Sequence, residues 1–411
     1  MRAKIVSSKT EKLNREQLIS EINESSIKHL WLANQIGVSE KTLSRWVSGD
    51  VTRIRSSNLN KLAIALDCSR EVLIAEPDKD DFPTDKNRNV LVNELNNDGL
   101  LYQLLVSSKI KLAISLIKST FHSSLPSGVI ANFYIKLGYA SLIHRKFRTA
   151  KKYITKGLTK AEVTNDNRLI FSANLGLAIT YFFECDYHKC QSYLIKCEQN
   201  MQYSGQEKAH LFNTFAMYYL YTGELQACID YANKCIEECA PNTGSIEKEL
   251  FLSSALQLRG ASQLLSGNTN QARLSCVESL NAAEQSKYKR SIAVSKAYLA
   301  AVHAVCNKTG LARKLIDESF KLVNNEDISY PSLLCIKAFV FRKSGEVQSL
   351  RELSSELISI SKPNSSLTAF MHYQEYLVLR QQKDSENAEQ TKEQIKTTLR
   401  NLELTNWIKA L

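Results

Sequence analysis

The sequence is poor in residues that break helices, with 14 glycines and six prolines among 411 residues. Beyond Leu100 it also has almost none of the alternation of polar and apolar residues that is typical of strands. The scarcity of both features predicts an all-α fold. Hydrophobic residues make up 44% of the chain, which is enough to build the cores of two or more domains.

Long apolar runs are also missing. No stretch approaches the roughly eighteen continuous apolar residues of a membrane span, and the N-terminus lacks the apolar segment and cleavage site of a signal peptide. A cytoplasmic protein without membrane segments is therefore expected. GxxxxGK loops, GxGxxG turns and GxSxG elbows are absent as well, and acidic pairs such as Glu237 and Glu238 lie in helical, solvated positions. We expect neither an enzyme nor a cofactor.

The ten cysteines include no CxxC pair, and the seven histidines include no HxxxH or HExxH spacing. Cys185, Cys190 and Cys197 are spaced as residues on a helix rather than as metal ligands. Reduced, buried thiols without a bound metal are therefore expected. Cys185 and Cys239 fall near predicted helix ends, where both burial and exposure stay open.

The stretch from Ser26 to Trp46 has the pattern of two short helices joined by a tight turn. Ser26 is the candidate N-cap of the first helix, whose apolar residues recur at three- and four-residue spacing. These residues are Leu30, Leu32, Ala33 and Ile36. Gly37 offers the left-handed backbone that ends a helix, and Ser39 is suited to cap the next one. The pattern predicts a helix-turn-helix.

The second helix, expected from Ser39 to about Ser48, has two different faces. Leu43, Trp46 and Val47 are spaced to close a small core. Charged and hydroxyl side chains on the other face suit contacts with base edges in a DNA major groove, while a helix N-terminus favours phosphate. The candidate DNA-binding residues, flanking cations included, are Lys28, Glu40, Lys41, Thr42, Ser44, Arg45, Arg53 and Arg55.

Flanking segments complete a pattern of five helices. The sequence predicts a helix from Asn14 to Glu24, a loop from Gly49 to Ser57, and short helices from Asn58 to Leu66 and from Ser69 to Ile74. The whole stretch resembles the phage-repressor-like (Cro and XRE type) DNA-binding family from Asn14 to Ala75. The matching residues are Leu32, Ala33, Gly37, Val38, Ser39, Leu43, Ser44, Trp46, Gly49, Leu62, Ala63, Leu66 and Leu73. The resemblance implies double-stranded DNA as a partner.

A charged stretch from Glu76 to Asn89 contains two of the six prolines and interrupts the apolar periodicity. We expect a linker over residues 76–89, with a DNA-binding domain over residues 1–75 before it. A helical domain over residues 90–411 is expected to follow. It would begin with a short helix from Val90 to Asn97.

Pairs of helical segments recur in this second part. Aligning the small residue near the start of each second helix gives spacings of 37, 40, 38, 44, 40, 38 and 38 residues. These anchor residues are Ala113, Ala150, Cys190, Cys228, Ala272, Ala312, Leu350 and Ala388. Small residues at helix crossings and aromatics in the first helices resemble tetratricopeptide repeats, with a longer period and without the prolines that end such repeats. The pattern predicts about seven to eight helix pairs, with cysteines packed where alanine is usual.

Stacked helix pairs are expected to form a right-handed superhelix whose concave surface is lined by the first helix of each pair. Amide side chains there suit a peptide backbone, aromatic rings and Met suit its side chains, and cations suit an acidic group or a C-terminal carboxylate. The candidate peptide-binding residues are Asn132, Lys136, Tyr139, Asn174, Asn213, Met217, Gln257, Tyr298, Arg342, Tyr373 and Arg380, with Phe182 and Tyr221 as further inward-facing candidates. Asn132, Asn174 and Asn213 are predicted to form a ladder.

A phage-repressor-like domain joined to such repeats resembles the peptide-sensing transcription regulators of bacteria and phages, the RRNPP-type group with its quorum-sensing and lysis-lysogeny receptors. The resemblance implies a homodimer whose repeat domain binds a short signalling peptide and thereby changes DNA binding. Two alternatives stay open. The repeats could be a scaffold for a larger partner such as an antirepressor or a polymerase subunit, or the protein could be an RNA- or toxin-binding adaptor.

Overall fold

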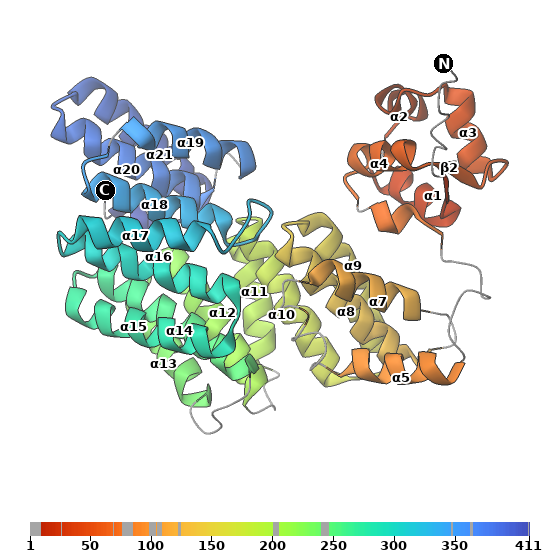
Figure 1. Ribbon diagram of the computed structural model, residues 1–411, viewed down its shortest axis with the longest axis horizontal. Coiled ribbons are helices and arrows are strands. Elements are labelled where there is room, and N and C mark those ends of the chain that lie inside the picture. The colour runs from red at the N-terminus through yellow and green to blue at the C-terminus, as the bar shows by residue number, and fades with distance from the viewer. Residues whose placement is uncertain are drawn as a thin grey trace, which may run out of the picture. The chain divides into compact units, whose positions relative to one another are not determined.

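The computed structural model describes residues 10–25, 27–68, 70–75, 85–97, 104, 109–121, 125–199, 205–239, 246–346, 348–361, 365–409 and 411. The chain divides into two compact units, residues 1–91 and 92–411. Helices dominate both units, and among the described residues the sheet structure is one ribbon of two strands with an adjoining bridge (Figure 1). The all-α prediction is confirmed apart from this ribbon.

The first unit packs short helices around one core. In chain order its elements up to residue 75 are β1 (Thr10–Lys12), α1 (Arg15–Ser25), α2 (His29–Ile36), α3 (Glu40–Ser48), β2 (Arg53–Arg55), α4 (Ser56–Ala65) and the 3₁₀ helix η1 (Arg70–Leu73). Leu18, Leu32, Leu43, Leu59 and Leu62 are completely buried at its centre. Each helix therefore contributes an apolar stripe to a single core, as the sequence periodicity predicts.

The antiparallel pairing of β1 with β2 corrects the loop predicted from Gly49 to Ser57. Thr10 faces Arg55, and Lys12 faces Arg53. Between these exposed arginines, the side chain of Ile54 is buried. Three residues of alternation are too few to predict a strand, and the partner strand lies far upstream in the chain.

Helix α2 begins at His29, with Lys28 at the N-cap position and no side-chain cap. The predicted cap, Ser26, lies outside the described residues. Leu30 was expected on the buried face, but its side chain is 57% exposed. The reason is geometric, because Leu30 stands two residues before the buried Leu32 and so points about 200° away from it around the helix.

The second unit is a stack of helix pairs. Its elements, beginning with the helix that crosses the unit boundary, are α5 (Asp85–Asn96), α7 (Ile110–Thr120), α8 (Ser127–Ile143), α9 (Phe147–Val163), α10 (Asn167–Phe183), α11 (Tyr187–Gln199), α12 (Gln206–Thr222), α13 (Leu225–Cys239), α14 (Ile246–Leu265), α15 (Thr269–Ser286), α16 (Lys289–Val305), α17 (Thr309–Phe320), α18 (Tyr330–Lys343), α19 (Gln348–Ile360), α20 (Ser366–Gln381), α21 (Ser385–Asn401) and α22 (Thr405–Lys409). Helix α5 starts five residues before the predicted Val90, inside the predicted linker.

The predicted anchor residues lie where helices cross. All eight fall in second helices of the pairs, from α7 to α21, and each is at most 5% exposed. In the pair of α8 and α9, two glycines allow the same close approach of the helices. A Cβ at Gly138 would lie 2.3 Å from Cγ1 of Ile154, and one at Gly157 would lie 2.7 Å from Cγ1 of Ile135. Small side chains at these points set the packing of α8 against α9.

Most repeat cysteines are packed as the sequence predicts. Seven of the ten are buried and unpaired. Cys239, whose exposure the sequence left open, is one of them, whereas Cys306 is exposed. Burial raises the pKa of the Cys197 and Cys276 thiols to about 12, so both stay protonated at neutral pH. Within the described residues no cluster of His, Cys, Asp and Glu is arranged to hold a metal ion.

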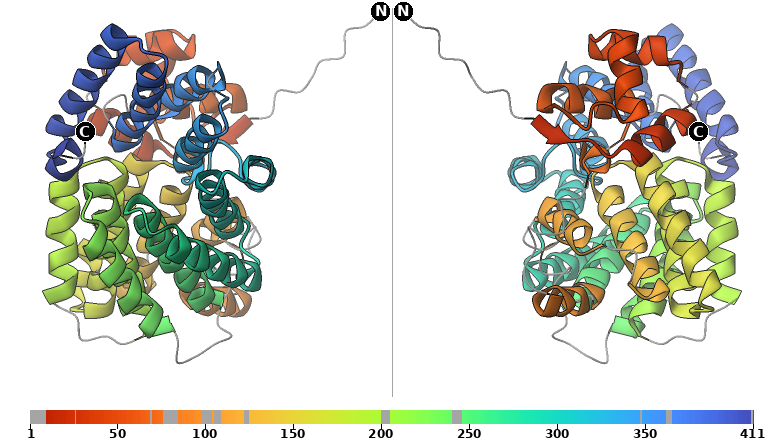
Figure 2. Two further views of the ribbon diagram at one scale, coloured as in Figure 1. Left: turned by 90° about the vertical axis from the view of Figure 1, so that its left-hand side faces the viewer. Right: turned by 90° about the vertical axis from the view of Figure 1, so that its right-hand side faces the viewer.

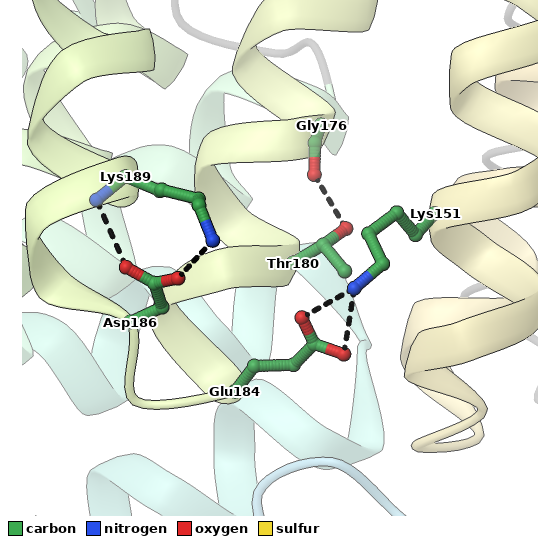
Figure 3. A network of polar contacts seen from close by, with 6 residues as sticks. All are labelled: Lys151, Gly176, Thr180, Glu184, Asp186 and Lys189. Carbon is green, nitrogen blue, oxygen red and sulfur yellow. Dashed lines mark hydrogen bonds and ion pairs between the residues drawn. The ribbon is translucent and has the colours of Figure 1, made fainter.

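Polar contacts join neighbouring helix pairs at their turns. Figure 3 shows Nζ of Lys151 on α9 between the two carboxylate oxygens of Glu184, at 2.9 and 3.2 Å. In the same turn, Asp186 accepts hydrogen bonds from the backbone N–H and the Nζ of Lys189, at 3.1 and 2.8 Å. The carboxylates thus tie α9 to the turn before α11 and cap the first turn of α11.

The C-terminal helices pack back on the middle of the second unit. The indole of Trp407 on α22 donates a hydrogen bond to the carbonyl of Tyr221 at 2.9 Å, and Asn406 donates to the carbonyl of Thr222 at 3.2 Å. The hydroxyls of Tyr187 and Ser366 lie 2.7 Å apart. In Figure 2 the blue C-terminal helices accordingly adjoin the yellow-green helices. No helix in the described ranges is long and apolar enough to cross a membrane.

Candidate nucleic-acid interface and helical groove

The turn between α2 and α3 has the predicted geometry. Gly37 is left-handed with φ of 78°, and the Ser39 side chain accepts a hydrogen bond from the Thr42 N–H at 3.1 Å. The hydroxyls of Ser39 and Thr42 also lie 2.8 Å apart. The Thr42 N–H also lies 2.9 Å from the Ser39 carbonyl, so two oxygens of Ser39 hold the first turn and α3 begins at a fixed point.

One face of α3 presents polar side chains to solvent. Leu43 and Trp46 are buried, and Val47 is half-buried against the same core. The predicted DNA-binding residues lie away from this core: Glu40, Lys41, Ser44, Arg45, Arg53, Arg55 and Lys28 are exposed, and Thr42 is half-buried. The structure thus gathers Lys41, Ser44 and Arg45 on the exposed face of one helix, while Arg53 and Arg55 extend from β2.

Two side chains that the sequence did not single out hold these helices in place. Nε of Arg15, at the start of α1, donates to the carbonyl of Val47 at 2.7 Å, and its side chain lies against Gly49. Nζ of Lys61 on α4 donates to the carbonyl of Ile36 at 2.9 Å. Both cations bind carbonyls near helix C-termini, where positive charge is favoured. No local signal marks them, because each partner lies on another helix.

Two predicted peptide-binding residues are engaged by the chain itself. The side-chain amide of Asn132 donates to the carbonyl and to Oδ1 of Asn96, at 2.9 and 3.0 Å. Nζ of Lys136 donates to the carbonyls of Leu95, Asn96 and Asn97, at 2.8, 2.8 and 3.1 Å. Both side chains thereby bind the C-terminal end of α5.

Gln257 is a buried structural residue, which corrects its prediction as a peptide-binding residue on the concave surface. Its side chain is 7% exposed, and Nε2 donates to Oγ of Ser295 at 2.9 Å and to the carbonyl of Ser291 at 3.2 Å. Ser253 and Ser279 complete this polar cluster between α14, α15 and α16. Its amide is already satisfied, so Gln257 serves helix packing.

The three asparagines predicted to form a ladder do not share one repeat position. Asn132, Asn174 and Asn213 precede the anchor residues of their pairs by 18, 16 and 15 residues. At about 100° per residue, Asn174 points about 160° away from Asn132, so the three cannot line up along one wall. Asn213 differs from the others because its Oδ1 is buried without a hydrogen-bond partner among the described residues.

The remaining predicted residues lie on first helices of the pairs. Met217, Tyr298 and Tyr373 are half-buried and pack against the helix-pair cores. The Tyr139 hydroxyl donates to the carbonyl of Ser172 at 3.0 Å. The Tyr221 hydroxyl lies 3.0 Å from that of Ser332 on α18, so α12 and α18 meet inside the stack. The buried Phe182 packs edge-on against Tyr221, with 4.9 Å between ring centroids.

Two arginines lie on α18 and α20, the first helices of the last two pairs. Nε of Arg342 donates to Oε1 of Gln374 at 2.8 Å, and its guanidinium lies 5.5 Å from the ring centroid of Phe339. Desolvation lowers the Arg342 pKa from its ordinary value, but an arginine stays charged at any physiological pH. Arg380 is exposed, 5.9 Å from the ring centroid of Tyr376. These two arginines are therefore oriented cations on α18 and α20.

The arrangement of α2, the Gly37 turn and the polar α3 agrees with a comparison of the sequence with known families. Residues 18–78 match the Cro/C1-type HTH DNA-binding domain. The resemblance to this domain class is thereby confirmed for the N-terminal unit. No curated protein matches the sequence.

Solved structures are similar to the chain beyond the HTH domain. A Rap protein complexed with Competence and Sporulation Factor matches with a TM-score of 0.60 and 12% identity, over 94% of this chain and 99% of that one. NprR in complex with its cognate peptide NprX matches with a TM-score of 0.53 and 15% identity, over 76% and 90% of the two chains. A structure described as phAimR-Ligand gives 0.51 and 15%, over 80% and 93%. At these identities the likeness shows a shared helical-repeat fold.

Proposed function

We propose that the protein is a transcription regulator that binds double-stranded DNA as a homodimer and whose helical repeats sense a short peptide. The observation that carries the proposal is the exposed polar face of α3 in a domain of Cro/C1 type. Lys41, Ser44 and Arg45 would read base edges in the major groove. Lys28, Arg53 and Arg55 would contact phosphates and so position the helix.

Support for a peptide ligand comes from the repeats. Two of the similar structures hold a named peptide or factor on the same fold. In this chain, first helices of the pairs carry Arg342 and Arg380, which would serve as cations for an acidic group of the peptide. Half-buried Met217, Tyr298 and Tyr373 would contact apolar side chains. We propose no enzymatic activity for a receptor of this kind.

The test of the DNA-binding part is selection of bound duplexes from a random library by the full-length protein. A homodimer should select inverted half-sites whose centres lie about one helical turn, roughly 34 Å, apart. Recovery of a single unrepeated half-site would contradict the dimer. Selection of no sequence at all would contradict base reading by α3.

The test of peptide sensing is mass spectrometry of molecules released from natively purified protein. Release of a short peptide, and a change of DNA affinity when it is added back, is the expected result. Co-purification of a folded protein instead would favour the scaffold alternative. If an added peptide binds without changing DNA affinity, the regulatory part of the proposal fails.

A further inference from the structure

The C-terminal end of α5 is bound by the first helix of the first complete pair. The ammonium of Lys136 on α8 donates to three successive carbonyls, those of Leu95, Asn96 and Asn97. One turn earlier on α8, Asn132 donates to the carbonyl and the side chain of Asn96. The Leu95 side chain is completely buried, so α5 is held by packing as well as by hydrogen bonds.

These contacts have the chemistry of a site for a carboxylate. The last carbonyls of a helix lack partners within the helix and carry a partial negative charge. An ammonium has three donors and no acceptor, so it suits a group of oxygens with negative charge. A free C-terminal carboxylate offers two oxygens and a full charge, and hydrogen bonds between ionised groups are stronger than those to neutral carbonyls. A side-chain amide nearby suits the last peptide group of such a ligand.

We propose that Asn132 and Lys136 form a site for the C-terminal carboxylate of a short peptide, and that α5 occupies this site in the structure described here. The proposal rests on the proposed function, because it specifies how the sensed peptide would bind. Peptide and α5 cannot share the Lys136 ammonium, so binding of one releases the other. In chain order α5 begins at Asp85, beyond the HTH match that ends at residue 78, so release of α5 would lengthen the segment between the HTH domain and the repeats.

Competition between α5 and the peptide predicts how substitutions change the affinity for the peptide. When a binding-competent state is populated only in part, the apparent dissociation constant rises by the inverse of that fraction. A change that loosens α5 and spares the α8 site should therefore tighten peptide binding. A change that loosens α5 and also removes the ammonium should weaken it. The two variants act alike on α5 and in opposite directions on the peptide.

The probes are two random hexapeptide libraries that are identical except for a free C-terminal carboxylate or a C-terminal amide. Full-length protein should retain peptides from the free-acid library. It should bind the corresponding amides at least about tenfold more weakly, because a charged contact is lost. Hydrogen exchange followed by mass spectrometry then reports on residues 85–97. A retained peptide should speed exchange there by about tenfold, because it displaces α5.

Two variants and one control test the mechanism with a retained peptide. Leu95→Ala should lower the apparent dissociation constant by about tenfold, and Lys136→Gln should raise it by about tenfold, while both speed exchange in α5. Lys160→Gln removes an exposed lysine of α9 and should change neither quantity. Asn96→Ala is a milder way to loosen α5 if thermal melts show that Leu95→Ala disturbs the remaining helices.

The outcomes separate this inference from the proposed function. Equal binding of acids and amides, or tight peptide binding with unchanged exchange in α5, would overturn the inference and leave peptide sensing intact. Weaker binding by Leu95→Ala and Lys136→Gln alike would also overturn it, because α5 would then support the ligand rather than compete. If no peptide from either library binds any variant, the inference and peptide sensing both fail.

Discussion

Single side chains of the HTH domain are expected to divide into base-reading and phosphate-binding groups. Arg45 is on the exposed face of α3, while Arg53 stands on β2 beside the buried Ile54. Arg45→Ala should cost about 1–3 kcal/mol on the selected DNA site and little on random DNA. Arg53→Ala should weaken both and reduce the salt dependence of binding, because one fewer counterion is released. Fluorescence anisotropy titrations at several salt concentrations measure both effects.

One outcome would contradict base reading by Arg45. Equal losses on selected and random DNA for Arg45→Ala would assign this side chain to phosphate rather than to bases. Ser57→Ala, at an exposed position of α4, is the control for general effects of substitution in the domain.

His210 makes stability depend on pH. Its imidazole lies 4.9 Å from the ring centroid of Phe251 and 6.0 Å from that of Tyr139, and burial lowers its pKa from 6.5 to about 4. Between these values the unfolded chain binds a proton that the folded chain does not. The contribution to stability is therefore present above about pH 6.5 and is lost as pH falls toward 4.

His210→Gln should remove this loss. The free energy of unfolding of the variant should fall by about 2 kcal/mol less than that of the wild type between about pH 7 and about pH 4.5. Urea titrations at the two pH values give the difference, in which the shared titration of carboxylates cancels. His188→Gln changes an exposed histidine of α11 and should behave as wild type. Parallel behaviour of His210→Gln and wild type would show that His210 is protonated alike in both states.

Cysteines in the second helices of the pairs are expected to react slowly as a group. Cys190, Cys228 and Cys276 lie at or near anchor positions, buried against the first helices. Reaction with a thiol reagent requires the thiolate, and burial both excludes the reagent and raises the thiol pKa. Native protein should therefore show one fast thiol, the exposed Cys306, seven slow buried ones, and two of intermediate rate, the half-buried Cys68 and Cys185, with all ten reacting after denaturation.

Substitution assigns the fast thiol in this experiment. Cys306→Ser should remove the fast phase and leave the slow one unchanged. Fast reaction of several thiols in the native protein would mean that the helix pairs open readily. Fewer than ten thiols after denaturation without reductant would reveal a disulfide.

The whole second unit is predicted to be stabilised by its C-terminal end. Trp407 is half-buried on α22, its indole hydrogen-bonds to the Tyr221 carbonyl, and it packs against Gly223. Trp407→Ala should cost about 2–3 kcal/mol, somewhat less than the truncation of a fully buried aromatic. Thermal melts measure the loss, and faster hydrogen exchange at the end of α12 locates it.

A second tryptophan provides the matched control. Trp31 on α2 is 48% exposed, so Trp31→Ala should change the melt much less. If the two substitutions have equal effects, or if exchange in α12 is unchanged by Trp407→Ala, the C-terminal helix does not stabilise the middle of the unit.

The sequence by itself determined the features that depend on neighbours in the chain. The Ser39 cap needs Thr42 three residues later, and Gly37 needs only its own freedom to adopt positive φ, so both were predictable. The anchor positions were predictable too, because each helix pair repeats the same demand for a small residue at a crossing. Helical content and the HTH domain follow from such local signals.

The tertiary structure alone decided which polar side chains stay available to a partner. Lys136 and Gln257 have side chains that suit peptide binding. In the structure, however, Lys136 binds the end of α5, and Gln257 is buried in a cluster of serines. The β1–β2 ribbon and the contact of Trp407 with Tyr221 likewise join segments far apart in the chain. Periodicity tells which face of a helix is apolar, but the polar partner of a side chain depends on where distant segments come together.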